Sequence, residues 1–191
     1  LHTRTVKAKS QAGLICPAIF KKADGVASRT ADQVESVSGI WLDNDGGDLS
    51  PQEFASMFPD LRVVVFNSYS STRANPRWRV FIPTTCAMTL QIYLTIVDQI
   101  IRIVNSHGFW TPEQVKRTKR AHNGKLHGFD ITKRQGHCLF YLPAQAANAT
   151  GTFFHDYKSE QRQPLNPQQW IDYATNYVKP APLSVVVPVT D

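Results

Sequence analysis

The pattern of hydrophobic and polar positions predicts a mixture of strands and helices. Short apolar runs rich in β-branched residues predict strands at 13–20, 37–42, 61–67, 78–82, 137–142 and 152–155. Apolar residues three or four positions apart, from Ile92 to Ile103, predict an amphipathic helix over 89–106. Strands and helices do not alternate regularly, so the sequence predicts an α+β fold rather than a doubly wound sheet.

Local signals predict where the other helices begin. Ser50 and Glu53 form an S-x-x-E capping box, and Pro51 suits the first helical position. The segment 111–120 predicts a short basic helix, and 166–173 predicts a last helix. Residues 21–35 are polar and are predicted to be a loop.

Length and composition set the domain organisation. A chain of 191 residues fits one domain, which we place at 1–178, followed by a Pro-punctuated tail or linker at 179–191. The chain begins at Leu1 without a methionine and reads as a piece of a longer protein. No run approaches the ~18 apolar residues that would span a bilayer, so we expect no membrane partner and a cytoplasmic location. Three widely separated cysteines without a CxxC pair favour buried free thiols over a zinc site.

The charge balance favours a polyanionic partner. Lys and Arg number 21 against 15 Asp and Glu, for a net charge of +6. Each cation that meets a phosphate releases condensed counterions, which favours nucleic acid. A charged surface that serves only solubility is the alternative.

Two carboxylates follow an apolar strand in the run Ile40-Trp41-Leu42-Asp43-Asn44-Asp45. Side chains two positions apart on an extended chain share a face, so Asp43 and Asp45 point the same way. Their mutual repulsion is relieved by a hard divalent cation, which prefers oxygen ligands. The alternative is an Asp-rich turn that ends the strand.

A hydroxyl-rich turn and an arginine-bearing strand come next, over 66–83. Ser70, Ser71 and Thr72 lie in the turn, and Arg77 and Arg79 alternate with Trp78 and Val80 along the strand. Hydroxyls and guanidinium groups hold phosphate oxygens well. The alternative is a surface hairpin whose arginines pair with nearby carboxylates, including Asp43 and Asp45.

A third segment, 127–143, carries a single carboxylate. Asp130 follows an apolar residue and precedes Lys133, Arg134 and His137. It is either a third metal ligand or the cap of a turn, which is what a lone Asp most often is.

In order and character, these segments resemble the motifs of the archaeo-eukaryotic primase superfamily, in its plasmid and phage variety. The segment 40–45 resembles the strand that ends in D-x-D. The segment 70–82 resembles the polar turn and basic strand, and 129–143 resembles the later Asp with its strand. The resemblance covers roughly 39–143. It departs at one point, because Arg79 stands where the family has the His of its S-x-H motif, and Arg cannot exchange protons as His does.

The resemblance implies an RRM-like mixed sheet with flanking helices and a DNA primase-polymerase activity. Asp43, Asp45 and Asp130 would then hold Mg²⁺ or Mn²⁺. The triphosphate of a nucleotide would meet Ser70, Ser71, Thr72, Arg77, Arg79, Lys133, Arg134 and His137. The implied partners are a DNA template and primer, nucleoside triphosphates and a helicase domain in the full-length protein.

A basic cluster between the second and third segments suits a template backbone. It consists of Lys116, Arg117, Lys119, Arg120 and Lys125. A solvated helix face is the alternative. Two other functions also remain open: a metal-dependent nuclease that uses the same carboxylates, and a non-catalytic DNA-binding module of a replication initiator.

Overall fold

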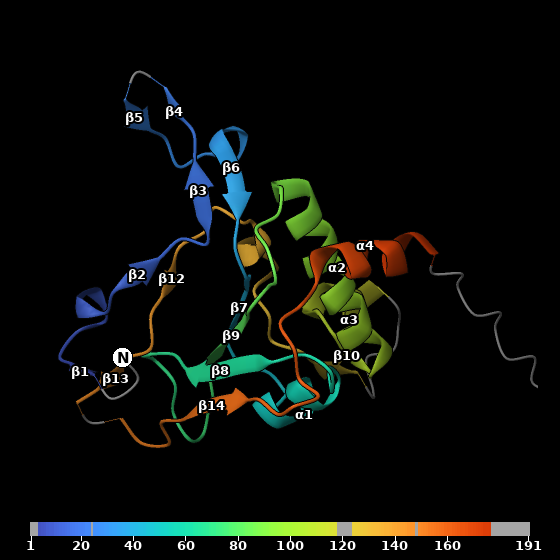
Figure 1. Cartoon of the computed structure of the whole chain (residues 1–191). Helices are drawn as coiled ribbons and strands as arrows, with labels where there is room; N and C mark the ends of the chain where they lie inside the picture. The colour runs from blue at the N-terminus through green and yellow to red at the C-terminus, as the bar shows by residue number, and fades with distance from the viewer. Residues whose placement is uncertain (1–3, 24, 118–123, 148, 177–191) are drawn as a thin grey trace, which may run out of the picture.

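A four-stranded antiparallel sheet lies at the centre of the protein (Figure 1). The computed structural model describes residues 4–23, 25–117, 124–147 and 149–176, so the predicted tail lies outside the described residues. Across the sheet the order is β14 (Phe154–Tyr157), β8 (Val63–Asn67), β9 (Trp78–Ile82) and β7 (Ile40–Asn44). Together with the helices, this confirms the predicted α+β class.

Helices cover one face of this sheet. They are α1 (Pro51–Ser56), α2 (Leu90–Ser106) and α4 (Pro167–Asn176), whereas α3 (Pro112–Arg117) is a further short helix without a buried residue. The largest hydrophobic cluster lies between α2 and the sheet, where Ile96 and Ile100 join Trp78 and Val80 in full burial. The apolar residues that recur every three or four positions along 89–106 are therefore the buried side of α2, as predicted for an amphipathic helix.

A second layer covers part of the opposite face. It contains β2 (Leu14–Ile15) paired with β12 (Phe140–Tyr141), and β1 (Thr5–Val6) paired with β13 (Gln145–Ala146). In Figure 1 this layer and the helices lie on opposite sides of the sheet. Trp41, Phe66 and Phe140 form the hydrophobic cluster between the layer and the sheet.

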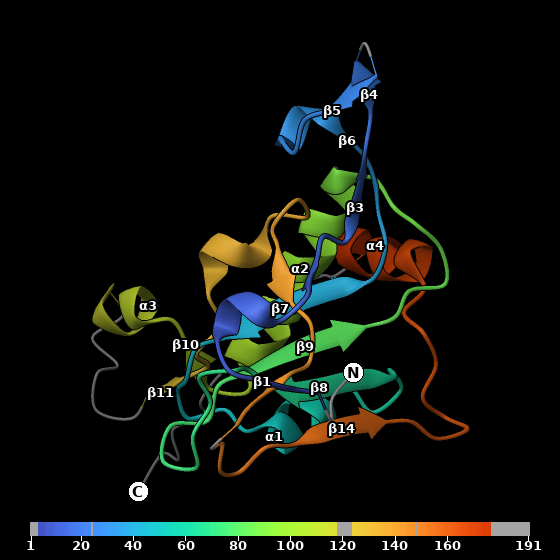
Figure 2. The same cartoon turned by 90° about the vertical axis from the view of Figure 1, so that its left-hand side faces the viewer.

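An arm projects from the body, away from the sheet (Figure 2). It is built from β3 (Ala18–Phe20) paired with β6 (Val34–Val37), and from a hairpin of β4 (Lys22–Ala23) and β5 (Val26–Ala27). The prediction of a loop over 21–35 was therefore wrong. The predicted strand 37–42 is two strands as well, since the chain turns at Gly39, whose φ of 71° suits a residue without a Cβ.

The predicted strand 13–20 is likewise split, into β2 and β3, at Cys16-Pro17, because proline has no N–H to give to a sheet. The remaining elements are short. They are β10 (Phe109–Trp110), which pairs with β11 (Lys125–Leu126), and three 3₁₀ turns, η1 (Lys9–Gln11), η2 (Ala31–Gln33) and η3 (Ile131–Arg134). The three cysteines are free, and Cys86 is exposed rather than buried.

The predicted capping signals are confirmed. The Ser50 hydroxyl accepts a hydrogen bond from the Glu53 N–H at 3.2 Å, and the Glu53 carboxylate accepts one from the Ser50 N–H at 2.9 Å. This reciprocal pair fixes the start of α1 just beyond the acidic loop, residues 43–48, which consists of the end of β7 and the turn after it. Among the described residues, no helix is both long and apolar enough to cross a membrane.

Candidate functional site

The acidic loop pairs with residues 126–130, the segment around Asp130. The Asp130 N–H donates to the Asp43 carbonyl at 2.9 Å, and the Asp45 N–H donates to the Gly128 carbonyl at 2.9 Å. Asn44 and Phe129 form the antiparallel bridge between the two segments. Residues 43 and 130 are therefore directly opposite, and their side chains leave the backbone on the same face. Two segments more than 80 residues apart in sequence thus meet side by side.

Glycines permit this close approach. Gly128 has a φ of 75°, and a Cβ on it would overlap the carbonyl oxygen of Gly46. A Cβ on Gly47 would lie 2.8 Å from the carbonyl oxygen of Leu126, closer than real Cβ atoms come to backbone. No larger residue at these positions would let the two backbones meet in this way.

Arg79 is the cross-strand neighbour of Asp43 on the other side. Its Nε lies 3.2 Å from Asp43 Oδ1, and each side chain is 5% exposed. That contact has the distance of an ion pair but not the geometry of a hydrogen bond; the bond from Arg79 Nη2 to Asp43 Oδ2 is long, at 3.5 Å. Lys133 Nζ lies 3.6 Å from the same Oδ2. Two cations therefore neutralise the Asp43 carboxylate.

The strand β9 presents its side chains as its alternation predicts. Trp78 and Val80 lie in the core beneath the helices, whereas Arg79 points to the face that carries Asp43. The Arg79 guanidinium also lies 5.8 Å from the centre of the Tyr141 ring, in the layer that covers this end of the sheet. The register of β7 and β9 ends at Asn44 and Trp78, and beyond it the Arg77 carbonyl accepts from the Ser68 N–H at 2.8 Å.

The hydroxyls of the turn between β8 and β9 stabilise the turn itself. Ser71 Oγ accepts from the Arg77 N–H at 3.1 Å, and Thr72 Oγ1 accepts from the Asn75 N–H at 3.0 Å. Ser70 is exposed. Arg77 Nε is buried without a hydrogen bond. Phosphate binding by this turn stays a prediction.

The side chains after Asp130 point in several directions. Asp130 caps η3, accepting from the Thr132 N–H at 2.9 Å and from its hydroxyl at 2.6 Å. Arg134 forms an ion pair with Asp98 of α2 at 2.7 Å. His137 is partly buried, and its Nδ1 has no hydrogen bond. Of the three predicted phosphate ligands in this segment, Lys133 is the one that contacts Asp43.

A metal ion fits these residues in chemistry and in backbone position, but not in their present side-chain arrangement. Asp43 and Asp130 offer hard oxygen donors from adjacent backbone segments, and Asp43 Oδ1 is buried without a hydrogen bond. However, within the described residues no three His, Cys, Asp or Glu side chains gather closely enough to hold a metal. Asp45 is exposed, and Asp43 already has two cationic partners.

His127 is a structural residue that the sequence did not single out. It is 1% exposed, its Nδ1 accepts from the Phe129 N–H at 2.8 Å, and its carbonyl accepts from Asn44 Nδ2 at 2.6 Å. Burial lowers the pKa of its imidazole to about 4. The ring is therefore neutral at pH 7 and helps to join the segment around Asp130 to the acidic loop.

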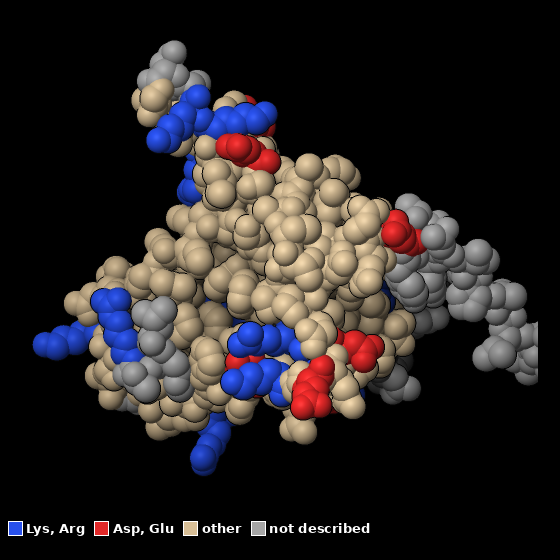
Figure 3. Space-filling view, in the orientation of Figure 1, with Lys and Arg blue, Asp and Glu red and all other residues tan. Residues whose placement is uncertain are grey.

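The predicted DNA-binding cluster is described in part. Lys116 and Arg117 are exposed on α3, and Lys125 Nζ lies 5.4 Å from the centre of the Phe109 ring. Lys119 and Arg120 lie outside the described residues. On the face shown in Figure 3, basic side chains are also found on the projecting arm and along the lower part of the body.

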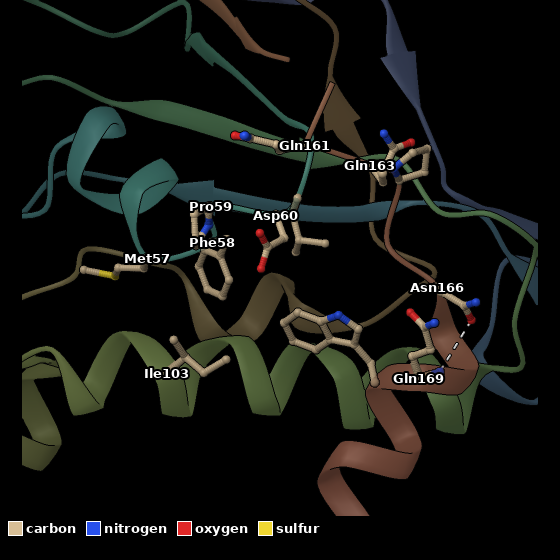
Figure 4. A pocket seen from close by; sticks show the side chains of 12 residues that line it. Met57, Phe58, Pro59, Asp60, Ile103, Gln161, Gln163, Asn166 and Gln169 are labelled. Carbon is tan, nitrogen blue, oxygen red and sulfur yellow. Dashed lines mark hydrogen bonds between the residues drawn. The ribbon is translucent and has the colours of Figure 1, made fainter. Parts of the chain in front are cut away.

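Among the cavities that the described residues form, two larger ones lie on opposite sides of the sheet. One, of about 510 Å³, opens on the face that carries Asp43 and is lined by Trp41, Arg62, Val64, Phe66, Phe81, Pro143, Phe154 and Asp156. The other, of about 570 Å³, lies on the helical side, where Trp170, Ile103 and the Gln and Asn side chains before and within α4 surround it (Figure 4). The second cavity contains none of the predicted site residues.

Comparison of the chain with protein-family models, with curated proteins and with solved structures finds no match.

Proposed function

We propose that this chain is the catalytic domain of a DNA primase-polymerase, which joins nucleotides to a primer on a DNA template. The observation that carries the proposal is the pairing of the acidic loop with the segment around Asp130. It brings the backbone of Asp130 opposite that of Asp43, and Arg79 and Lys133 contact the Asp43 carboxylate. That combination of acidic and basic groups suits a triphosphate with its cation.

The order of elements supports the proposal. The strands of the sheet, taken with α1 and α2, come in the order β7, α1, β8, β9, α2 and β14, which is the β-α-β-β-α-β order of ferredoxin-like folds, to which RRM-like cores belong. Between α2 and β14 the chain also forms β10, α3, β11, β12 and β13. One feature departs from an RRM, in which the last strand lies beside the first: here β14 pairs with β8 rather than with β7.

In this proposal Asp43, Asp45 and Asp130 would hold Mg²⁺ or Mn²⁺. When bound, the cation would neutralise charge on the triphosphate and activate the primer hydroxyl. Arg79 and Lys133 would exchange their contacts with Asp43 for phosphate oxygens, and the exposed cations of α3 would contact the template. The chemistry then depends on positioning and charge, not on a general base of special pKa.

A non-catalytic DNA-binding module of a replication initiator is the second candidate. It is favoured by the buried ion pair between Asp43 and Arg79, which leaves the carboxylates ungathered. In that case the acidic loop serves the fold alone.

Primer extension tests the proposal. The protein is incubated with Mn²⁺, dNTPs and a 5′-labelled primer on a longer template, beside a variant that carries Asp43→Asn and Asp45→Asn. Asp60→Asn, an exposed residue on the helical side, is the control. The proposal expects longer strands with the wild type and the control, and none with the double variant. Shortened strands would indicate a nuclease. Intact DNA binding without any product would support the initiator module.

A further inference from the structure

One cross-strand row of the sheet runs from two aromatic rings at the β14 edge to Asp43 at the β7 edge, on the face that the second layer partly covers. The strand registers place Phe154, Phe66, Arg79 and Asp43 side by side in one cross-strand row, from β14 to β7. Residues opposite one another in antiparallel strands share a face. The row is therefore aromatic at the β14 edge and charged at the β7 edge.

The neighbouring row on the same face is largely aromatic and apolar too. It consists of Asp156, Val64, Phe81 and Trp41. The Trp41 and Phe81 ring centres lie 4.8 Å apart, and the Phe66 and Phe154 rings are stacked, with centres 6.2 Å apart and planes at 19°. The cavity of about 510 Å³ lies over the second row and the aromatic end of the first, and its volume falls within the range of small-molecule sites.

Exposure shows which rings a ligand can reach. Phe154 is 41% exposed and Phe81 is partly exposed, whereas their neighbours Trp41 and Phe66 are buried in the cluster with Phe140. At the rim, Arg62 and Asp156 hold each other through two hydrogen bonds, of 3.1 and 2.8 Å, and the bond from Arg62 lowers the pKa of the Asp156 carboxyl. This cavity thus offers flat apolar rings beside the fixed ion pair of Arg62 and Asp156.

We propose that this cavity of about 510 Å³ holds an unpaired base of single-stranded DNA, stacked on the rings of Phe154 and Phe81. The inference rests on the proposed function, since it assigns a place to one base of the template. Stacking suits any base, because every base has a flat π-face. The strand's phosphates would run toward the charged end of the rows, where Lys133 contacts Asp43 and Lys9 Nζ lies 4.9 Å from the centre of the Tyr141 ring. An apolar peptide would gain little from these cations, which is why we favour a polynucleotide.

Fluorescence anisotropy with a labelled oligo(dT), without metal and without dNTPs, tests the proposal. Replacing a stacking ring by alanine costs about 1–3 kcal/mol per base, so Phe154→Ala should bind about 5- to 150-fold more weakly. Phe154→Leu should lose DNA affinity by the same factor, and Phe154→Trp should bind DNA as tightly as the wild type does. Val26→Ala, which removes an exposed apolar side chain on the projecting arm, is the matched control and should change nothing.

A second probe separates stacking from a loss of fold. An oligonucleotide with abasic sites should bind the wild type more weakly by a similar factor, whereas Phe154→Ala should not distinguish it from oligo(dT). Equal binding of both probes by the wild type, or wild-type affinity in Phe154→Ala, would overturn the assignment of the cavity. Primer extension that persists in that case would leave the proposed function standing. A wild type that binds no DNA would overturn both.

Discussion

Removal of the Asp43 carboxylate should destabilise the protein strongly, for an electrostatic reason. Its partner Arg79 is 4% exposed and would keep its charge in a site that water does not reach. Removing one member of a buried ion pair typically costs about 3–5 kcal/mol, because the remaining charge is uncompensated. The contact with Lys133 adds little, since a side chain 35% exposed can turn to solvent and its interaction is screened. We therefore expect Asp43→Ala to lower the free energy of unfolding by about 3–5 kcal/mol.

The double variant Asp43→Asn, Arg79→Met isolates this effect. It removes both charges from the same site, and such replacements are often neutral or stabilising. Urea unfolding followed by circular dichroism gives the free energy of unfolding of each variant. The electrostatic account is refuted if Asp43→Ala lowers the free energy of unfolding by less than about 1 kcal/mol. It is also refuted if the double variant loses as much unfolding free energy as Asp43→Ala does. The result also governs functional tests, because inactivity of an unfolded variant says nothing about metal binding.

Three further predictions concern the structure around the site. Gly128→Ala should abolish cooperative folding or lower the free energy of unfolding by several kcal/mol, because its Cβ would overlap the Gly46 carbonyl. Gly108 has a φ of 88° with open space around it, so Gly108→Ala should lower the free energy of unfolding by only about 1 kcal/mol in the same urea assay. The pKa of His127 is about 4 in the folded protein and about 6.5 when unfolded, so stability should be full above pH 6.5 and fall by about 3 kcal/mol as the pH drops to 4. An unchanged urea midpoint over that range would contradict this. Ser50→Ala should cost about 1 kcal/mol through loss of the α1 cap, and no change in the midpoint would count against the capping role.

Much of the fold could be predicted because local patterns carry it. The period of 89–106 predicted α2 almost to the residue, and the S-x-x-E signal predicted the start of α1. The alternation along 77–82 predicted that Trp78 and Val80 share one face of β9 and that Arg79 lies on the other. The hairpin in the arm was missed although Asp24-Gly25, a dipeptide typical of tight hairpins, stands between its strands.

The site was harder to predict, because its geometry depends on long-range pairing and on competition between partners. Periodicity shows that Asp43 leaves one face of a strand, but not that Arg79 is its direct cross-strand partner. The hydroxyls of Ser71 and Thr72 suggest a phosphate site in the sequence, whereas in the structure both accept hydrogen bonds from the turn's own backbone. The aromatic row was missed for a similar reason: Phe66 and Phe154 come from strands far apart in the chain, and only the register makes them neighbours.

The neutralised state of Asp43 leads to a last prediction, on the coupling between nucleotide and metal. If Arg79 and Lys133 turn to a triphosphate, they leave Asp43 buried without compensation, and a divalent cation is what can restore the balance. Nucleotide affinity should therefore rise when Mn²⁺ is present, by more than the complexation of the nucleotide itself accounts for. The affinity of a fluorescent dNTP analogue, measured with and without Mn²⁺, gives the coupling free energy. Asp43→Asn supplies the reference, because its neutral side chain needs no cation and should show only the effect of complexation. Equal coupling in the wild type and in Asp43→Asn would mean that the carboxylate takes no part in binding, and would leave Asp43 as a structural partner of Arg79.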